Sequence, residues 1–361
     1  MKHALLPLVP LLLISPFCLA LDMAELEVDH NVNSSFVTPH TVWAKPYVLG
    51  QTRVLCFVNG RGTNAREVVE LKQRFDLDPQ MVFWGRVVDT KRDEWHGADA
   101  GIRRIADLLD QKWDAFVFLE VALENLPPEQ QYSLIKAVTD GAGLVLIGAN
   151  DKRVLKAKNM LEQPAFLSDV EDARAFSIRQ GRGVRLPKRP TIAYRPGWEV
   201  AYDEWDMRVG KAILWAADRA PRLNLALAPK GSHLPREALP GTAATLSWKG
   251  ALAAATAEVT LRRQDGTVIP LPQHSLGHPE GAVALEIPIV QAGAYVIDVI
   301  AREGKRVASF GSIALTVISQ RNVENVALDP DWAEIGEPLS GEITLSGNPG
   351  TNERLVVGLL D

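Results

Sequence analysis

The sequence predicts an α/β domain followed by an all-β domain, namely a flavodoxin-like, doubly wound parallel sheet and then an antiparallel β-sandwich. Two observations indicate this fold class. Between residues 51 and 220, short apolar runs alternate with amphipathic helical segments, which is typical of parallel strands joined by crossover helices. From residue 221 onward, apolar and polar residues alternate and no helical segment intervenes, as in strands that bury one face.

The first fifty residues are expected to lie outside both domains. Residues 1–20 combine a basic start, an apolar run from Leu5 to Ile14 and a small-residue end at Ala20, which is typical of a secretory signal peptide. The run is too short and too proline-broken to span a membrane. We therefore expect a secreted or periplasmic protein without membrane contact once the signal is removed. Residues 21–50 are polar and are predicted to be an extended N-terminal segment.

The predicted α/β domain spans residues 51–220. Its first strand, Val54–Val58, is apolar throughout, as expected for a strand buried on both faces. A helix follows over Asn64–Phe75, in which Asn64 and Glu67 are spaced as a capping box. The remaining expected elements, in chain order, are a strand over 81–84, a helix through 102–109, a strand over 115–120, a helix opened by Pro127 and Pro128, a strand over 144–148 and a helix over 203–218.

Residues 221–320 are predicted to form an immunoglobulin-like β-sandwich. The short expected strands are separated by turns and lie at 223–227, 244–248, 257–262, 283–287, 294–300 and 312–318. Residues 321–361 begin a further set of strands that stops before another sandwich is complete. Either these strands join the preceding domain or the chain is a truncated piece of a longer protein. We favour truncation and expect downstream domains of that protein as partners.

The composition argues against several classes of function. The net charge of -5 is mild and spread along the chain, so no basic stripe predicts nucleic acid as a partner. Removal of the signal would leave Cys56 as the only cysteine, which excludes an intramolecular disulfide. Because Cys56 lies inside an expected buried strand, we expect a structural residue rather than a reactive thiol. His274 and His278 lie four apart in a loop, where we expect no metal site.

The segment Gly60–Ala65 has the spacing G-x-G-x-x-A at a strand-to-helix turn, close to the fingerprint of dinucleotide-binding folds. That fingerprint also needs an acidic residue at the end of the next strand, where this sequence has Gly85 and Arg86. Arginine suits a 2′-phosphate, so an NADP-binding oxidoreductase stays as a second alternative function. An exported protein would have to find this cofactor outside the cytosol. We therefore expect the glycines to form a turn and the protein to use no cofactor.

Nucleophilic catalysis finds no support in the α/β part of the sequence. A nucleophile belongs at a sharp turn between strand and helix, but the best candidate turn offers Gly148, Ala149 and Asn150. His96 is the only histidine between residues 51 and 218. A Ser-His or Cys-His relay cannot be assembled from these residues.

Four segments together resemble the class I glutamine amidotransferase-like superfamily, and within it the trehalose-utilisation-type branch found at the front of large secreted bacterial proteins. They are PHTVWAKP (39–46), REVVELKQRFDLD (66–78), LPPEQQYSLIKAVTDGAGLVLIG (126–148) and AILWAAD (212–218). In active amidotransferases a cysteine nucleophile ends the strand before the elbow, and this position is Gly148 here. No histidine matches the later triad position either. The resemblance, over about residues 39–220, therefore implies the fold without glutaminase activity, and a role near polysaccharide.

Residues that follow the predicted strands are candidates for ligand binding, because the carboxyl ends of strands line the crevice of a doubly wound sheet. Trp95 and Trp198 are the tryptophans in expected loops, where a ring can stack on a sugar. The expected ligand-binding residues are Asn59, Arg61, Arg66, Asn150 and Trp198.

Carboxylates provide the remaining candidates for catalysis, namely Glu120, Glu199 and Asp203. Glu120 ends the third expected strand, and one acid from the Glu199–Asp206 group would complete the pair that glycoside hydrolysis needs. A carbohydrate-active hydrolase or isomerase is thus the alternative function. Acidic residues at the start of a helix also favour its dipole without any catalytic role. The function predicted first is a secreted, non-catalytic module with carbohydrate as a partner, forming the front section of a larger exported protein.

Overall fold

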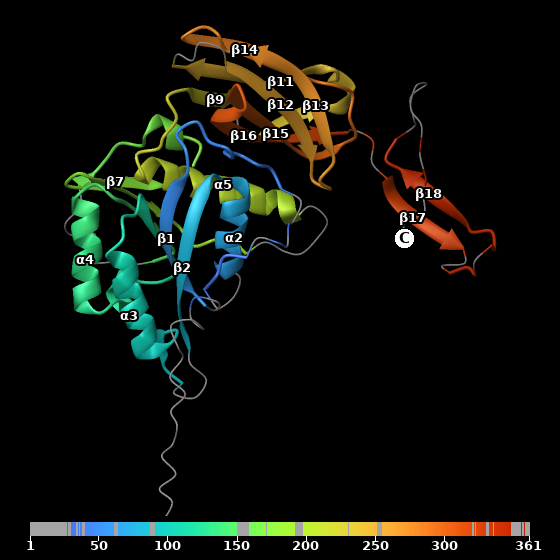
Figure 1. Cartoon of the computed structure of the whole chain (residues 1–361). Helices are drawn as coiled ribbons and strands as arrows, with labels where there is room; N and C mark the ends of the chain where they lie inside the picture. The colour runs from blue at the N-terminus through green and yellow to red at the C-terminus, as the bar shows by residue number, and fades with distance from the viewer. Residues whose placement is uncertain are drawn as a thin grey trace, which may run out of the picture.

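The computed structural model describes residues 27, 30–33, 35, 37, 40–60, 64–86, 91–149, 159–170, 172–191, 198–229, 231–250, 255–319, 321, 323–329, 332–334, 336–347, 355 and 357. Figure 1 shows the arrangement of their helices and strands. The predicted signal peptide lies outside these residues. Among the helices described, none is long and apolar enough to cross a membrane.

A large, mostly parallel sheet forms the first part of the structure. Its strands are β1 (Thr52–Asn59), β2 (Leu77–Arg86), β3 (Asp93–Trp95), β4 (Ala115–Leu119), β5 (Gly143–Ile147), β6 (Asn159–Met160), β7 (Arg174–Ile178) and β8 (Gly181–Leu186). Within the described residues the order is β3-β2-β1-β4-β5-β8-β7-β6. The neighbours β2, β1, β4, β5 and β8 pair in parallel, whereas β3, β7 and β6 extend the two ends antiparallel.

Helices cover both faces of this sheet, as predicted (Figure 1). They are α2 (Asn64–Arg74), α3 (Ala98–Leu109), α4 (Pro128–Thr139) and α5 (Trp198–Ala216), with short 3-10 turns η1 (Leu123–Asn125) and η3 (Ala165–Leu167). Side chains alternate along β1, because successive residues of a strand point to opposite faces. Val54, Cys56 and Val58 pack with α2 and α5. Leu55 and Phe57 pack with α3 and α4. The predicted α/β part is therefore confirmed.

Some predicted element boundaries were wrong. Strand β2 begins at Leu77 rather than at residue 81, because its first residues pair with the start of β1. Strands β7 and β8 were not predicted, since Arg174 begins the short apolar run of β7, and Arg182 and Arg185 interrupt that of β8. Helix α5 begins at Trp198, so Asp203 lies inside the helix and not at its N-terminus, where the dipole would favour it.

The second part of the structure consists of sheets packed face to face. The strands are β9 (Asn224–Ala228), β10 (Ser232–Pro235), β11 (Gly241–Lys249), β12 (Ala255–Arg263), β13 (Val268–Ser275), β14 (Glu280–Ile287), β15 (Gly293–Glu303) and β16 (Arg306–Ile318), with a 3-10 turn η4 (Arg236–Ala238). Among the described residues they form the sheets β10-β16-β15-β12-β13 and β14-β11-β9. Leu246, Leu285 and Ile297 belong to the apolar core shared by the two sheets. All pairings except β10–β16 are antiparallel, which confirms the predicted all-β part.

A hairpin of β17 (Val323–Asp329) and β18 (Ser340–Leu345) follows the sandwich. In Figure 1 it lies apart from the two sheets of the sandwich. Its apolar residues Val326 and Leu328 are exposed. The divisions of the chain near residues 220 and 320 stay predictions.

A buried series of alternating charges joins the α/β part to the sandwich. Asp203 on α5 lies between two arginines, with Oδ1 2.6 Å from Arg74 Nη2 on α2 and Oδ2 2.6 Å from Arg262 Nη1 on β12. Arg262 Nε donates in turn to Asp298 Oδ2 on β15 over 2.8 Å. At the other end, Glu70 pairs with both Arg66 and Arg74. We call this series the ion chain: Arg66, Glu70, Arg74, Asp203, Arg262 and Asp298.

An aromatic contact reinforces the same junction. Phe310 of β16 is buried, and its ring centroid lies 6.0 Å from Trp43, 5.7 Å from Phe75 and 5.9 Å from Phe166. Beside it, the backbone N–H of Val307 donates to Pro46 O over 2.9 Å. Val307 and Phe310 thus belong to the core of the α/β part, although they lie on a sandwich strand.

We expect Arg262→Met to lower the free energy of unfolding by about 3–5 kcal/mol, because it leaves Asp203 and Asp298 buried without their shared partner. The matched control is Arg302→Met, since Arg302 pairs with Glu258 across the same two strands in a partly exposed setting. That change should cost about 1 kcal/mol or less. Urea unfolding of both variants measures the difference. Equal losses would contradict a special role for the ion chain.

Candidate functional site

The candidate site lies at the carboxyl ends of the parallel strands. Asn59 ends β1, Glu120 follows β4, Gly148 follows β5, and Lys188 comes shortly after β8. From β1 the chain crosses to β2 on one side, whereas from β4 it crosses to β5 on the other. The two crossovers diverge at the β1/β4 boundary, and such a boundary opens the crevice in which open α/β sheets bind ligands.

Glu120 holds a constrained position in this crevice. Its φ of 55° is in the left-handed region, which non-glycine residues seldom adopt outside turns and functional sites. The backbone N–H donates to Ile147 O over 2.9 Å, and the carbonyl accepts from Asn59 Nδ2 over 3.4 Å. Oε2 lies 2.8 Å from Lys188 Nζ, with the Glu120 side chain 17% exposed. The structure thus brings Asn59 and Glu120 together, as predicted, and adds Lys188.

Gly148 has the backbone geometry of a sharp turn, and a side chain there would crowd its neighbours. Its φ is 64°, a conformation that glycine adopts without steric cost. A Cβ atom added there would lie 3.2 Å from Glu120 Cγ and 3.2 Å from both Cα and Cβ of Lys188. The Glu120–Lys188 pair therefore occupies the space that a side chain at position 148 would need.

A buried carboxyl lies behind the crevice. Glu67 in the first turn of α2 accepts a hydrogen bond from Trp205 Nε1 over 2.8 Å, and its Oε2 is 3.5 Å from Arg189 Nη1. Burial raises the pKa of Glu67 to about 7, against an ordinary value of 4.5. The guanidinium of Arg189 also lies over the ring of Tyr202, 5.4 Å from its centroid.

Sequence reasoning missed this role of Glu67 and assigned the residue to a capping box. The carboxylate faces the interior toward Trp205 instead of returning to the start of its own helix. The signal was present in the spacing, because Glu67, Leu71 and Arg74 lie at i, i+4 and i+7 and share one helix face. Two charged residues in an apolar stripe indicate buried ionic partners on another element.

The other predicted ligand-binding residues pair away from the crevice or lie outside the described residues. Arg66 pairs with Glu70 one helical turn further on, at 2.5 Å. Arg61 and Asn150 lie outside the described residues. So does the side chain of Trp198, although the residue begins α5.

Of the predicted catalytic carboxylates, Glu120 and Asp203 can be placed, and they lie apart. The side chain of Glu199 lies outside the described part of the chain. Asp203 is fully buried in the ion chain, held by Arg74 and Arg262, so it serves the junction between the two parts. Glu120 is the predicted carboxylate that the structure places in the crevice.

Three further predictions concern single residues. Trp95 was expected in an exposed loop, but it is 3% exposed on β3 and its indole N–H donates to Asn125 O over 3.0 Å, so that prediction was wrong. Cys56 is buried as predicted, and burial raises the pKa of its thiol. His274 lies on β13. The residues that the structure describes contain no group of His, Cys, Asp and Glu suited to a metal ion.

We expect Gly148→Ala to destabilise the protein by about 1–3 kcal/mol more than Gly304→Ala, because the new methyl group must displace Glu120 and Lys188. Gly304 is the matched control: its φ of 58° is similar, and no atom lies within 4 Å of an added Cβ. Both substitutions carry the cost of a left-handed backbone, so the difference in thermal unfolding reports the contact alone. Equal losses of stability in the two variants would show that Glu120 and Lys188 move aside at no cost.

We expect the free energy of unfolding to fall as pH rises from 4.5 to about 7, the interval in which folded Glu67 keeps a proton that the unfolded chain has lost. The contribution of this group is about 3 kcal/mol. Glu67→Gln stays neutral throughout, so its fall over this interval should be smaller by that amount. Urea unfolding at a series of pH values tests this, with Glu129→Gln on the exposed face of α4 as control. Parallel curves for the protein and Glu67→Gln would refute it.

No protein-family model and no curated protein matches the sequence. Among solved structures, the CARDB domain of a Pyrococcus furiosus protein is 15% identical over 27% of this chain and 89% of its own, with a TM-score of 0.22. A beta-glucosidase from Listeria innocua in complex with glucose is 11% identical over 78% of this chain and 47% of its own, at 0.20. An endo-beta-1,4-mannanase from Thermotoga petrophila is 12% identical over 63% and 51%, at 0.21. Likeness at these TM-scores assigns neither a fold family nor a function to this chain.

Proposed function

We propose that this chain is an exported, non-catalytic module of the glutamine amidotransferase-like type, joined to an immunoglobulin-like sandwich at the front of a larger protein that binds or breaks down polysaccharide. The order of the parallel strands supports the fold in this proposal. Numbered along the chain, these five strands lie in the order 2-1-3-4-5, which is the order of flavodoxin-like sheets.

The observation that carries the proposal is Gly148. In the proposed family this position holds the nucleophile, which needs a side chain exposed at a sharp turn. Here the turn is kept, with φ at 64°, while Glu120 and Lys188 approach within 3.2 Å of any Cβ. A cysteine could not take the place of this glycine without moving that pair. Among the residues that the structure describes, position 148 thus supplies no nucleophile to the crevice, whereas Asn59, Glu120 and Lys188 offer groups that can bind a ligand.

The groups around the crevice suit a ligand that carries hydroxyl groups. The Glu120 carboxylate accepts hydrogen bonds, the Lys188 ammonium donates them, and the Asn59 amide does both. Glu120 and Lys188 lie 2.8 Å apart, so this pair offers hydrogen bonds without a net charge. The carbohydrate class itself comes from the resemblance of residues 39–220 to the family.

Binding to polysaccharides and soluble oligosaccharides tests the proposal. We expect the protein to bind such ligands, Glu120→Gln to bind about tenfold more weakly, and neither to hydrolyse sugar or glutamine. Glu286→Gln, on the exposed side of β14, is the matched control and should bind normally. If Glu120→Gln binds the ligand as well as the unchanged protein does, the crevice is not the binding site.

One observation favours the alternative function, a carbohydrate-active hydrolase. Glu67, with its raised pKa, interacts electrostatically with Glu120, and a protonated acid near an ionised carboxylate is the pattern of a glycosidase pair. Sugar hydrolysis that falls with pH above about 7 and is lost in both Glu67→Gln and Glu120→Gln would establish this function instead.

A further inference from the structure

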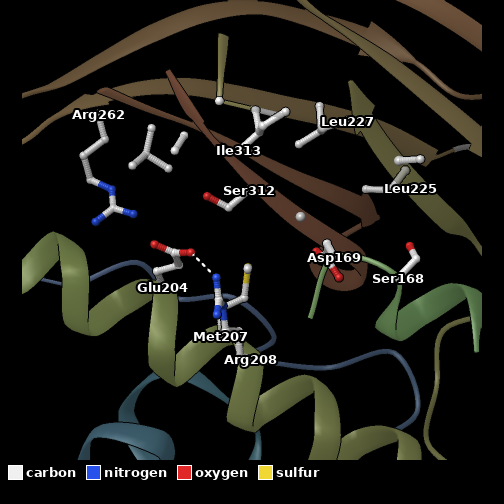
Figure 2. Close-up of a pocket in the computed structure, with 15 residues that line it drawn as sticks. Ser168, Asp169, Glu204, Met207, Arg208, Leu225, Leu227, Arg262, Ser312 and Ile313 are labelled. Atoms are coloured by element: carbon white, nitrogen blue, oxygen red, sulfur yellow. Dashed lines mark hydrogen bonds and ion pairs between the residues drawn. The ribbon is translucent and has the colours of Figure 1, made fainter. Parts of the chain in front are cut away.

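A cavity lies at the junction between α5 and the sandwich, and its lining does not include Asn59, Glu120 or Lys188 (Figure 2). Its volume is about 410 Å³, within the range of small-molecule sites. Helix α5 supplies one wall, the strands β9, β12, β15 and β16 supply the opposite wall, and residues after η3 close one end. We call this cavity the junction cleft.

The charged side chains that line the junction cleft are already paired. Glu204 Oε1 lies 2.5 Å from Arg208 Nη2, and the dashed line in Figure 2 marks this pair. Asp169 pairs with Lys211. Arg262 is held by the two carboxylates of the ion chain. A charged ligand would have to break one of these pairs, so the cleft favours a neutral one.

Hydrogen-bonding capacity nevertheless remains on the cleft wall. Arg262 has five N–H groups, of which three donate to Asp203 and Asp298 within the described structure. Ser312 donates its hydroxyl proton to Asp298 Oδ1 over 2.8 Å, which leaves its oxygen lone pairs as acceptors. Glu204 lies at the rim with its side chain 53% exposed. A ligand that both donates and accepts can bond to these groups together.

The remaining wall is aliphatic. Leu225 and Leu227 of β9 are half-buried, and Ile313 of β16 lies beside them in Figure 2. An apolar face on the ligand would cover these side chains and remove them from water. The ligand that fits is therefore neutral, small, rich in hydroxyl groups and apolar on one face, which describes a pyranose ring.

We propose that the junction cleft binds a saccharide unit between α5 and the sandwich. The choice of a saccharide rests on the proposed function, whereas the site is distinct from the crevice at Glu120. Such a ligand contacts both parts of the molecule at once. Its binding therefore stabilises their junction by mass action and raises the unfolding temperature of the whole chain.

Blocking substitutions at the rim test the site without touching the core. Ala226 and Ala314 are exposed residues of the cleft lining, so Ala226→Trp and Ala314→Trp fill its entrance while the ion chain stays intact. Ala284→Trp is the matched control, because Ala284 is an exposed alanine on β14 outside the lining. The probes are glucose, trehalose and cellobiose, followed by saturation-transfer NMR, backbone amide shifts and thermal unfolding of the full chain.

We expect at least one probe to shift the amides of residues 225–227 and 312–314, and each rim variant to weaken that binding about tenfold or more. Ala284→Trp should leave it unchanged. Shifts of these amides that survive both rim variants, or the lack of binding by any probe, would overturn the inference. If Glu120→Gln alone abolishes binding, the crevice is the sugar site and the cleft is not. If the rim variants abolish these shifts and no probe shifts the amides of Asn59 and Glu120, the cleft stands and the proposed crevice site fails.

Discussion

The structure depends on the ion chain, because it connects the two parts of the molecule through ion pairs of the buried residues Arg74, Asp203, Arg262 and Asp298. Its six members alternate in sign, with three arginines and three carboxylates running from α2 through α5 to β12 and β15. Buried ions are tolerated only when each has a close partner of opposite charge. Removal of any interior member leaves its neighbours without a partner of opposite charge. Ion pairs as well as apolar packing therefore fix the position of the helices relative to the sandwich.

The balance between burial and ion pairing also explains the raised pKa of two buried carboxyls outside the ion chain, Asp206 and Glu67. Asp206 lies 3.4 Å from Arg74 Nε, but Arg74 already serves Glu70 and Asp203. Burial therefore raises the pKa of Asp206 well above its ordinary value. Glu67 is in the same situation, with a long contact to Arg189 and a hydrogen bond from a neutral indole. Both carboxyls retain protons more firmly because burial outweighs the contacts of Asp206 with Arg74 and of Glu67 with Arg189.

The central strands could be predicted from the sequence because each of them is a continuous run of apolar residues. Strands β4 and β5 are apolar and buried along their whole length, and the helices beside them show a clear period. Strands β7 and β8 lack such a run, since arginines occupy their exposed and half-buried positions. The crevice was predicted only where residues follow strands, as Asn59 and Glu120 do. Lys188 was missed because its strand was missed.

The junction could not be predicted at all, because its partners are far apart in the chain. Asp203 and Arg262 are 59 residues apart, and the sequence around either residue does not indicate that the two form an ion pair. Helix α5 shows why this matters for function. Asp203 and Asp206 lie on the face that meets α2, Trp205 reaches Glu67 behind the crevice, and Glu204 faces the junction cleft. The ion chain that fixes α5 thereby also sets the positions of Trp205 and Glu204 on the same helix.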